Sequence, residues 1–356
     1  MERHLSVPGM RLVVRCDAPE LVRPFFKIFG DLSGIPSWPS PTQDVQVRID
    51  AAGGFLDDGI HRHRLASGPL RPAHVYNLLY RTLVRRIQGV FLLHAAAVEQ
   101  AGRAWLIGGP SGAGKTSLAC GLLRRGYGFL GDDLAPLAVA DGRIYPFPRR
   151  LGLLRDAAGE EQRGAAVEMA DKRFLSSAVM GARLVSEPLS PGAVVLINPY
   201  LEREGPVRMS VGLEGDPGTV LEALAGVDGL EVRRSEPAAG ITVLDLILSG
   251  GLAIATAEEV VHRADHQVLF HSRGYGSRKE YAEVPSLVPL STRHAALELL
   301  RETLNREPSS ALMIRHEGRI ARVLFELMGL LEGVPCYRLT AAGVEDTCDL
   351  LASRFG

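Results

Sequence analysis

The sequence predicts an α/β fold with three parts: a core built around a glycine-rich loop, a small α/β module before it, and an α+β insertion within it. A short apolar run at 103–109 leads into the glycine-rich stretch 108–117, and helical spacing follows directly. Strand-like and helix-like segments alternate before this stretch and again at 205–288. We therefore expect a module at 1–88, a core of 89–204 plus 289–356, and an insertion at 205–288.

The N-terminal module is expected to mix strands and helices. RLVVRC (11–16) has the apolar pattern of a short strand, and VQVRID (45–50) alternates apolar and polar residues like a half-buried one. Helices are expected at 18–29 and 72–88, the second with its apolar residues on one side. The Pro- and Ser-rich stretch 33–43 predicts a loop between the strands.

The core is expected to be a sheet with helices. We predict strands at 89–100 and 103–109, joined by a turn at Ala101-Gly102, and a helix from Lys115 to Arg125 that Gly126 ends. GFLGDD (128–133) and LAPLAV (134–139) should continue the same sheet, and Asp141-Gly142 should turn the chain back. AVVLINPY (193–200) has the composition of a buried strand that ends in a loop.

The remaining elements follow from the same patterns. Within 205–288 we expect strands at VRMSV, LEVRR and QVLFH and helices at 217–225 and 257–265, while ITVLDLIL suits a strand or a helix. With ITVLDLIL as a strand, the order is βαββαβ. Beyond the insertion, helices are expected at 293–305, 320–331 and 342–354, and a strand at 336–339.

The glycine-rich stretch fits the phosphate-binding pattern G-x-x-x-x-G-K-[ST] in full. Its glycines allow a tight turn whose N–H groups point at phosphates, and the helix that follows presents its positive end to the same anion. The lysine supplies a mobile charge, and the threonine hydroxyl suits Mg²⁺. The sequence thus predicts a bound nucleotide and Mg²⁺, with the nucleotide bound by Gly109, Pro110, Ser111, Gly112, Ala113, Gly114, Lys115, Thr116 and Ser117.

Two carboxylates, Asp132 and Asp133, end a predicted strand shortly after the loop. Strand ends beside such a loop converge on the phosphates. One carboxylate can hold Mg²⁺ together with Thr116, and the other can take a proton from an attacking hydroxyl. Like charges side by side also raise one of the two pKa values. We assign the metal to Thr116 and Asp132, and leave open which carboxylate is the base.

Signatures of two other nucleotide-binding classes are incomplete. None of the lysines stands in the Asn-Lys-x-Asp motif of a GTPase. Leu248-Ser249-Gly250-Gly251 begins like the signature of a transporter ATPase, but Leu252 replaces the glutamine, and no strand ending in Asp-Glu follows. The sequence therefore lacks the second motif that a motor ATPase or a nucleotide-dependent switch would need.

The chain resembles the HPr kinase/phosphorylase superfamily, and more closely its HPr-kinase-related members. The resemblance rests on His94-Ala95-Ala96-Ala97, GPSGAGKTSLACGLLRRGYGFLGDDLAPL and YPFPRRLGL, covering 91 to about 155, and more weakly on AVVLINPY and GVPCYRLT. It implies a core like that of phosphoenolpyruvate carboxykinase, and catalytic roles for Lys115, Asp132, Asp133 and His94. It also implies an ATP-dependent kinase whose favoured acceptor is a serine of a protein or peptide.

The sequence departs from this family at one point. The best-known enzymes of the family carry a Glu-x-Arg-Gly run after the Asp pair, which is not found here. Arg149-Arg150 is the nearest basic pair. It contacts either a phosphate or an acidic acceptor, or belongs to a solvated basic loop. The sequence accordingly does not predict phosphorylase activity, nor HPr itself as the acceptor.

Several other stretches of the sequence allow more than one interpretation of their role. His262 and His266, with Asp265 beside them, have metal-ligand spacing on a predicted helix, but surface histidines are far commoner. His61 and His63 alternate on a predicted strand without an evident third ligand. HSRGYGSRKEY (271–281) is a basic loop that suits a lid, an acceptor-binding segment or a surface connection.

Composition limits the classes of function. The formal net charge of -1 gives no electrostatic case for nucleic acid or an anionic membrane, and no apolar run is long enough for a membrane span. Without a signal-peptide pattern, the expected location is the cytoplasm. The four cysteines lack CxxC spacing and are expected to be reduced, mostly buried thiols. A small hydroxyl metabolite as acceptor, a non-catalytic nucleotide sensor, and a homo-oligomer all remain open.

Overall fold

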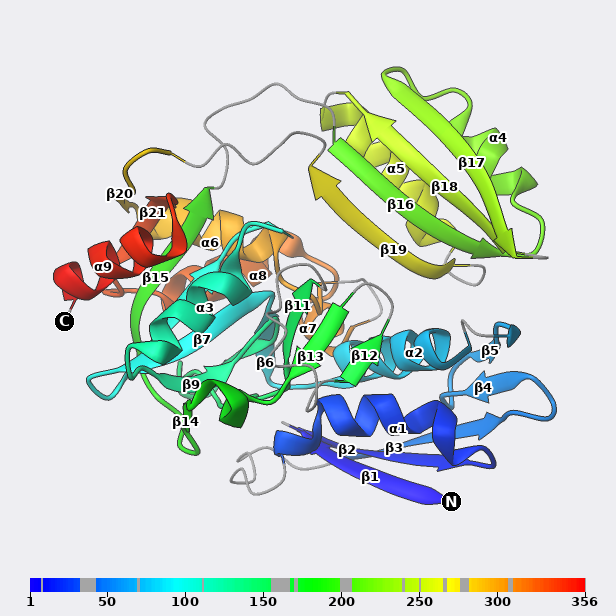
Figure 1. The fold of residues 1–356 in the computed structure, drawn as a ribbon, viewed down its shortest axis with the longest axis horizontal. Helices are drawn as coiled ribbons and strands as arrows, with labels where there is room; N and C mark the ends of the chain where they lie inside the picture. The colour runs from blue at the N-terminus through cyan, green and yellow to red at the C-terminus, as the bar shows by residue number, and fades with distance from the viewer. Residues whose placement is uncertain are drawn as a thin grey trace.

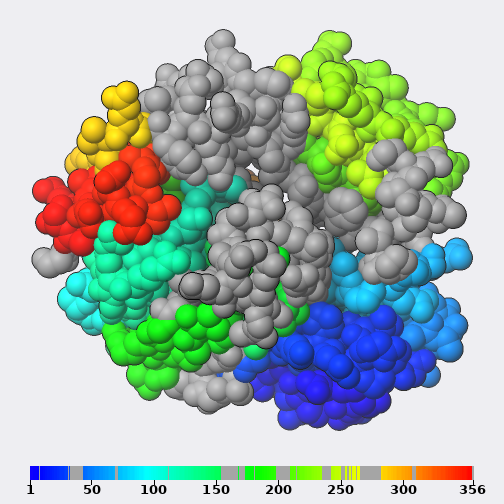
Figure 2. Space-filling model, viewed as in Figure 1, coloured from blue at the N-terminus to red at the C-terminus, as the bar shows by residue number. Residues whose placement is uncertain are grey.

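The computed structural model is a mixed α/β protein with several sheets (Figure 1). It describes residues 1–7, 9–32, 43–68, 71–110, 112–154, 167–169, 172–198, 207–238, 241–249, 251–264, 268–275, 282–306 and 310–355. Figure 2 shows that the N-terminal residues and the residues from 207 to 264 occupy separate parts of the visible surface. The division of the chain into domains stays a prediction.

The N-terminal residues form a five-stranded sheet of order β1-β2-β3-β4-β5 with two helices packed on it. β2 and β3 are parallel, and the other neighbouring pairs are antiparallel. The strands predicted at 11–16, at 45–50 and around His61 and His63 are confirmed, as are both predicted helices, whereas β1 and β4 were not expected. The bounds are β1 Glu2–Val7, β2 Met10–Cys16, α1 Pro19–Ile28, β3 Gln43–Asp50, β4 Phe55–Asp57, β5 Arg62–Arg64 and α2 Arg71–Arg86, with a short 3-10 turn at Gly30–Leu32.

A seven-stranded mixed sheet of order β14-β9-β7-β8-β15-β21-β20 carries the glycine-rich loop. β8 is parallel to β15, and β15 to β21, while β7 is antiparallel to both β8 and β9. Its strands β7, β8 and β9 are largely buried, as expected for the part of a sheet that is covered on both faces. They are β7 Ala95–Gln100, β8 Arg103–Gly108, β9 Gly128–Gly131, β14 Arg183–Leu184, β15 Pro191–Asn198, β20 Ser286–Leu290 and β21 Cys336–Thr340.

Helices cover both faces of this sheet, and alternate residues of its strands pack on opposite sides. On one face, α3 and α9 pack against Trp105 and Ile107. On the other, residues of α6, α7 and α8 pack against Leu106 and Leu196. The predicted helices are confirmed, and α7 is additional. The bounds are α3 Lys115–Arg124, α6 Thr292–Arg301, α7 Ala311–Arg315, α8 Ile320–Leu330 and α9 Val344–Phe355.

Two core predictions are wrong in detail. The segment 89–100 is not one strand: it breaks at His94 into β6 (Val90–Leu93) and β7. The segment 134–139 does not continue the main sheet, because β10 (Ala135–Ala138) pairs with β6 in a separate two-stranded sheet. The predicted turn at Asp141-Gly142 is confirmed by the Ala138 N–H, which donates to the Arg143 carbonyl at 2.8 Å. A further small sheet contains β11 Leu151–Leu154, β13 Lys172–Leu175 and β12 Val167–Met169, before a 3-10 helix at Ser177–Met180.

The segment from 207 to 275 has the predicted βαββαβ order. Its strands form an antiparallel sheet of order β17-β18-β16-β19, the arrangement of ferredoxin-like units. ITVLDLIL, which suited a strand or a helix, is the strand β18. The elements are β16 Val207–Glu214, α4 Gly218–Leu224, β17 Leu230–Ala238, β18 Ile241–Leu248, α5 Gly251–Arg263 and β19 Val268–Tyr275, and one apolar cluster joins both helices to the sheet.

Two expectations from composition can be compared with the described residues. All four cysteines are buried and free of disulfides, as expected. Among the helices that the structure describes, none has the length and apolar character needed to cross a lipid bilayer.

Candidate functional site

The strand directions explain why the predicted site residues meet at one edge of the seven-stranded sheet. β8 runs into the loop at this edge, and β9 runs the same way and ends just before Asp132. β7 lies between them and runs in the opposite direction, so its first residue follows His94 at the same edge. The pairing of Ala95 with Gly108 fixes this alignment. Residues far apart in the sequence thereby become neighbours.

The loop needs glycine for physical reasons. Gly109 has a φ of +144°, and a Cβ there would lie 2.9 Å from the Ile197 carbonyl oxygen. Gly112 and Gly114 have φ values of +78° and +97°, a region that L side chains rarely adopt. Gly114 is the N-cap of α3, so the loop leads directly into the helix N-terminus. The predicted strand, loop and helix are therefore all present.

Lys115 and Thr116 occupy the first turn of α3. The Lys115 ammonium is buried and donates to the carbonyls of Gly109 at 2.7 Å and Pro110 at 3.1 Å. The Thr116 hydroxyl lies 3.0 Å from each carboxylate oxygen of Asp132. Asp132 itself has no exposed surface. A hydroxyl facing a buried carboxylate is the oxygen pair that Mg²⁺ uses beside a phosphate-binding loop.

The two adjacent carboxylates point to different partners. Asp133 has a φ of +61°, which is uncommon for a residue other than glycine, although Asp tolerates it. Asp132 faces Thr116, whereas Asp133 contacts Arg149 and His94. Burial, reinforced by the neighbouring charge of Asp133, raises the pKa of Asp132 to about 6. The carboxylate with the raised pKa is thus the one beside Thr116.

Arg149 is the central cation of the site. Phe147 forms an isolated β-bridge with Gly131. A Cβ at Gly131 would lie 2.9 Å from the Phe147 carbonyl oxygen, so residues 147–149 pass close beside the end of β9. The Arg149 guanidinium donates to the Asp132 carbonyl at 3.0 Å, to the Asp133 carboxylate, and to the Tyr76 hydroxyl at 3.3 Å. Arg149 as a whole is only 3% exposed, so the alternative of a solvated basic loop is wrong for this residue.

Arg150 lies next to this network and is half-buried. Its backbone N–H donates to the Ile28 carbonyl at 2.9 Å, at the end of α1. The arginine pair therefore joins the phosphate-loop edge to the N-terminal helices, through Tyr76 of α2 and Ile28 of α1. Contact of either arginine with a phosphate or an acceptor stays a prediction.

His94 lies between two carboxylates. Its Nε2 is 3.5 Å from Asp133 Oδ1, and its Nδ1 is 3.3 Å from Glu302 Oε2. The segment after α6 runs beside β6 and holds Glu302 there: the Glu302 carbonyl accepts from the His94 N–H at 2.9 Å, and the Leu304 N–H donates to the Leu92 carbonyl at 2.8 Å. Burial alone would lower the His94 pKa, but the hydrogen bonds to Asp133 and Glu302 raise it above its ordinary value.

This pairing gives a testable prediction for a Glu302→Gln variant. Removing the Glu302 charge should lower the His94 pKa, because one of the two groups that favour the imidazolium is gone. The His94 imidazolium of this variant should then lose its proton at a lower pH than in the unaltered protein. An NMR titration of the His94 ring measures this directly. Glu298→Gln, which removes an exposed carboxylate one turn earlier in α6, is the matched control and should leave the His94 pKa unchanged. An unchanged pKa in both variants would contradict the assignment.

The structure brings together most of the predicted site residues and adds two. A connected network joins Thr116, Asp132, Arg149, Asp133 and His94, and Lys115 lies beside Thr116 and contacts the loop carbonyls. Ser111 lies outside the described residues, as do Asp265, His266 and 276–281. The side chains of His262 and of 268–275 are likewise outside the description. Glu302 and Tyr76 were not singled out from the sequence, since neither belongs to a motif and Glu302 lies 208 residues from His94.

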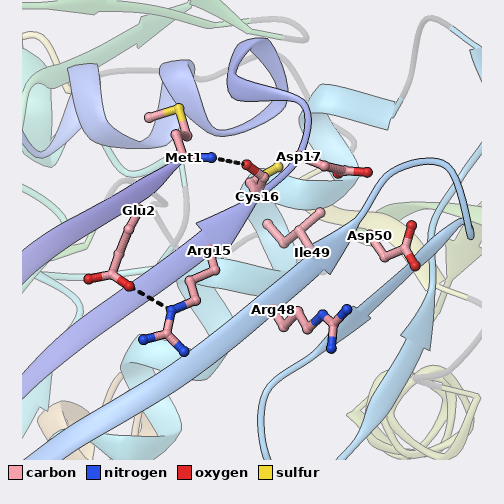
Figure 3. Close-up of a pocket in the computed structure, with 8 residues that line it drawn as sticks. All are labelled: Met1, Glu2, Arg15, Cys16, Asp17, Arg48, Ile49 and Asp50. Atoms are coloured by element: carbon pink, nitrogen blue, oxygen red, sulfur yellow. Dashed lines mark hydrogen bonds and ion pairs between the residues drawn. The ribbon is translucent and has the colours of Figure 1, made fainter.

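A separate hollow lies at the outer end of the N-terminal sheet (Figure 3). It is lined by the ends of β1, β2 and β3, including Glu2, Arg15, Arg48 and Asp50. Glu2 and Arg15 form an ion pair at 2.6 Å across it. Its walls thus carry both signs of charge, and none of the lining residues belongs to the site around Asp132.

Comparison with known proteins gives one partial match. A curated protein from Bordetella petrii, described as HPr kinase/phosphorylase, is 33% identical to this chain over 107 residues. The match covers 30% of this chain and 30% of the relative. No protein-family model matches the chain. These findings support a relationship to an HPr kinase/phosphorylase over part of the chain, and with it a kinase-like function. They do not assign the chain to a family.

Proposed function

We propose that this protein is an ATP-dependent phosphotransferase that moves the γ-phosphate to a hydroxyl, with a serine of a protein or peptide as the acceptor. The observation that carries the proposal is the contact of the Thr116 hydroxyl with both oxygens of buried Asp132, directly behind the glycine-rich loop. The partial likeness to a protein described as HPr kinase/phosphorylase supports both the reaction class and a protein acceptor. The phosphoenolpyruvate-carboxykinase-like core belongs to the same proposal.

The residues present fit Mg²⁺ and ATP. Gly109, Gly112 and Gly114 have positive φ values, which suit a loop whose backbone N–H groups turn inward, and Gly114 leads into the N-terminus of α3, where an anion is stabilised. The Lys115 ammonium donates to the carbonyls of Gly109 and Pro110, and phosphate oxygens can take the place of these acceptors. Thr116 and Asp132 would hold Mg²⁺. The ion, when bound, neutralises charge that develops on the phosphate oxygens.

Asp133 is the proposed base. Its side chain is 19% exposed, whereas Asp132 is fully buried and engaged with Thr116. Asp133 can therefore reach an acceptor hydroxyl and take its proton as the oxygen bonds to phosphorus. Arg149 and His94 fix the carboxylate from two sides, which orients it for this transfer. This assigns the metal to Asp132 and the proton transfer to Asp133.

Protonated His94 would stabilise charge on the group being transferred. Two carboxylates keep its ring in place, and their hydrogen bonds favour the imidazolium. Glu302 is thus a positioning residue: it contacts His94 and is not required to contact the substrate. Preorganised charge of this kind is worth the most where water is excluded, and His94 is largely shielded from water.

A Lys115→Ala variant tests the nucleotide part of the proposal. It should bind ATP about 100-fold more weakly, because a charge-assisted contact to phosphate of about 1.5–3 kcal/mol is lost. Isothermal titration calorimetry with Mg²⁺-ATP measures the change. Lys27→Ala, which removes an exposed lysine of α1, is the matched control and should bind like the unaltered protein. Equal ATP affinity in the Lys115→Ala and unaltered proteins would remove the loop from the site.

A further inference from the structure

A second polar cluster lies at the turn between β4 and β5, in the stretch Asp58-Gly59-Ile60-His61-Arg62-His63. The Asp58 N–H donates to the His61 carbonyl at 3.1 Å. Asp58 Oδ1 accepts from the N–H groups of Ile60 at 3.0 Å and His61 at 2.7 Å. Gly59, with a φ of +82°, allows the tight bend. This folds His61 back over Asp58, and His63 lies on the same side because strand residues two apart share a face.

We propose that Asp58, His61 and His63 bind a Zn²⁺ ion at this turn. One ligand atom from each residue lies within 4.8 Å of the other two. The sequence alone offered the two histidines without a third ligand; the fold supplies it as a carboxylate at the preceding bend. The site is separate from the phosphate-loop residues and goes beyond the proposed phosphotransfer.

The distances within the cluster suit a shared ion better than direct hydrogen bonds. His61 Nδ1 is 3.9 Å from Asp58 Oδ1, and His63 Nε2 is 3.8 Å from Asp58 Oδ2. Both exceed hydrogen-bond length. Two ligands of one tetrahedral Zn²⁺ lie roughly 3.3 Å apart when their bonds are about 2.0–2.1 Å long. The three ligand atoms lie within 4.8 Å of one another, so each would have to move toward the ion by up to about 1 Å.

One side of the proposed zinc site is buried, and the other side is open to solvent. Asp58 is 6% exposed, and the Thr82 hydroxyl of α2, which donates to the Leu78 carbonyl at 2.9 Å, lies 3.5 Å from its Oδ2. The His61 side chain, by contrast, is 55% exposed and that of His63 is 14% exposed. Three protein ligands leave the fourth position of a tetrahedral ion to water or to another molecule, which is the open form of a zinc site.

The charge and the ligand types select the metal. Asp58 Oδ1 accepts hydrogen bonds from the backbone N–H groups of Ile60 and His61, and such donors favour the ionised carboxylate. Two imidazole nitrogens with one carboxylate oxygen suit Zn²⁺, whereas Mg²⁺ prefers an all-oxygen site such as Thr116 and Asp132. The chain would then keep two different ions at two places.

Zinc titration of the full-length protein tests this proposal. The protein is stripped with a chelator, dialysed, and titrated with Zn²⁺ in the presence of millimolar Mg²⁺, which occupies oxygen-only sites. His61→Ala and His63→Ala should each weaken binding at this site at least about tenfold, since even loss of an outer-shell partner costs 10- to 100-fold. His4→Ala, an exposed histidine paired with Glu2 on β1, is the matched control and should behave like the unaltered protein.

Two further measurements make the zinc titration decisive. His61 is largely exposed, so His61→Ala should fold normally, and circular dichroism checks this before the titration. Lys115→Ala should leave Zn²⁺ binding unchanged, which separates this site from the phosphate loop. Equal zinc affinity and stoichiometry in the unaltered, His61→Ala and His63→Ala proteins would overturn the proposal, as would binding that only Lys115→Ala weakens.

Discussion

An Asp133→Asn variant is expected to transfer phosphate about 1,000-fold more slowly than the unaltered protein, while its ATP affinity changes only a few-fold. Asparagine has the shape of aspartate but cannot take a proton from an acceptor hydroxyl. Its oxygen can still accept the hydrogen bond that Arg149 donates to this position, so the buried arginine keeps a partner. The ATP-binding contacts of Lys115 and Thr116 are untouched.

The comparison needs two controls. Asp228→Asn removes an exposed carboxylate just before β17 and should leave transfer unchanged. Asp132→Asn should also abolish transfer, but with weakened Mg²⁺ binding, because Asp132 faces the Thr116 hydroxyl. If Asp133→Asn transferred phosphate at the normal rate while Asp132→Asn kept normal Mg²⁺ affinity, the two roles would be assigned to the wrong residues.

An Arg149→Met variant is expected to lower the free energy of unfolding by about 3 kcal/mol or more. Arg149 is 3% exposed and donates to Asp133, to the Asp132 carbonyl and to Tyr76. Methionine fills much of the volume but leaves Asp133 and the Asp132 carbonyl without this donor. Breaking a buried pair by removing one partner costs far more than losing an exposed one. Urea unfolding followed by circular dichroism measures the loss.

Arg143→Met is the matched control, since Arg143 is exposed at the turn after β10, and its loss should cost less than about 0.5 kcal/mol. A double-mutant cycle with Asp133→Asn, which keeps a hydrogen-bond acceptor, isolates the charge interaction between Arg149 and Asp133 and should give a coupling above about 1 kcal/mol. Arg149→Met would also remove a contact that orients Asp133, so transfer should fall together with stability. Near-zero coupling and equal stability in the Arg149 and Arg143 variants would show that the contact network is not what holds the Asp pair.

The local parts of the site were predictable because they depend on neighbours in sequence. The glycine spacing, the apolar strand before it and the helix from Lys115 are all present, and Asp132 faces Thr116 as the strand-end argument required. The βαββαβ order of 207–275 was likewise readable from periodicity. In each case, the interactions that determine the local structure involve residues close to one another in the sequence.

The parts that could not be predicted depend on distant partners. β6 and β7 separate at His94 because the segment 302–305 pairs beside β6, and nothing in FLLHAAAV signals this. Glu302 faces His94 for the same reason. The sequence left open whether Arg149 lies at the site or in a solvated basic loop, and the close approach of Phe147 to Gly131 places it in the interior. Asp58 joins the two histidines only through a bend stabilised by its own side chain.

The most direct test of phosphotransfer is the fate of the γ-phosphate. The purified protein is incubated with Mg²⁺, γ-labelled ATP and an extract of the source organism separated into macromolecular and small-molecule fractions, with Asp133→Asn and Asp228→Asn alongside. The proposal predicts label in a protein or peptide band with the unaltered and Asp228→Asn proteins, and none with Asp133→Asn. Label confined to small molecules would replace the peptide acceptor with a metabolite. Label that reaches only inorganic phosphate, or that appears equally with Asp133→Asn, would contradict an Asp133-dependent kinase.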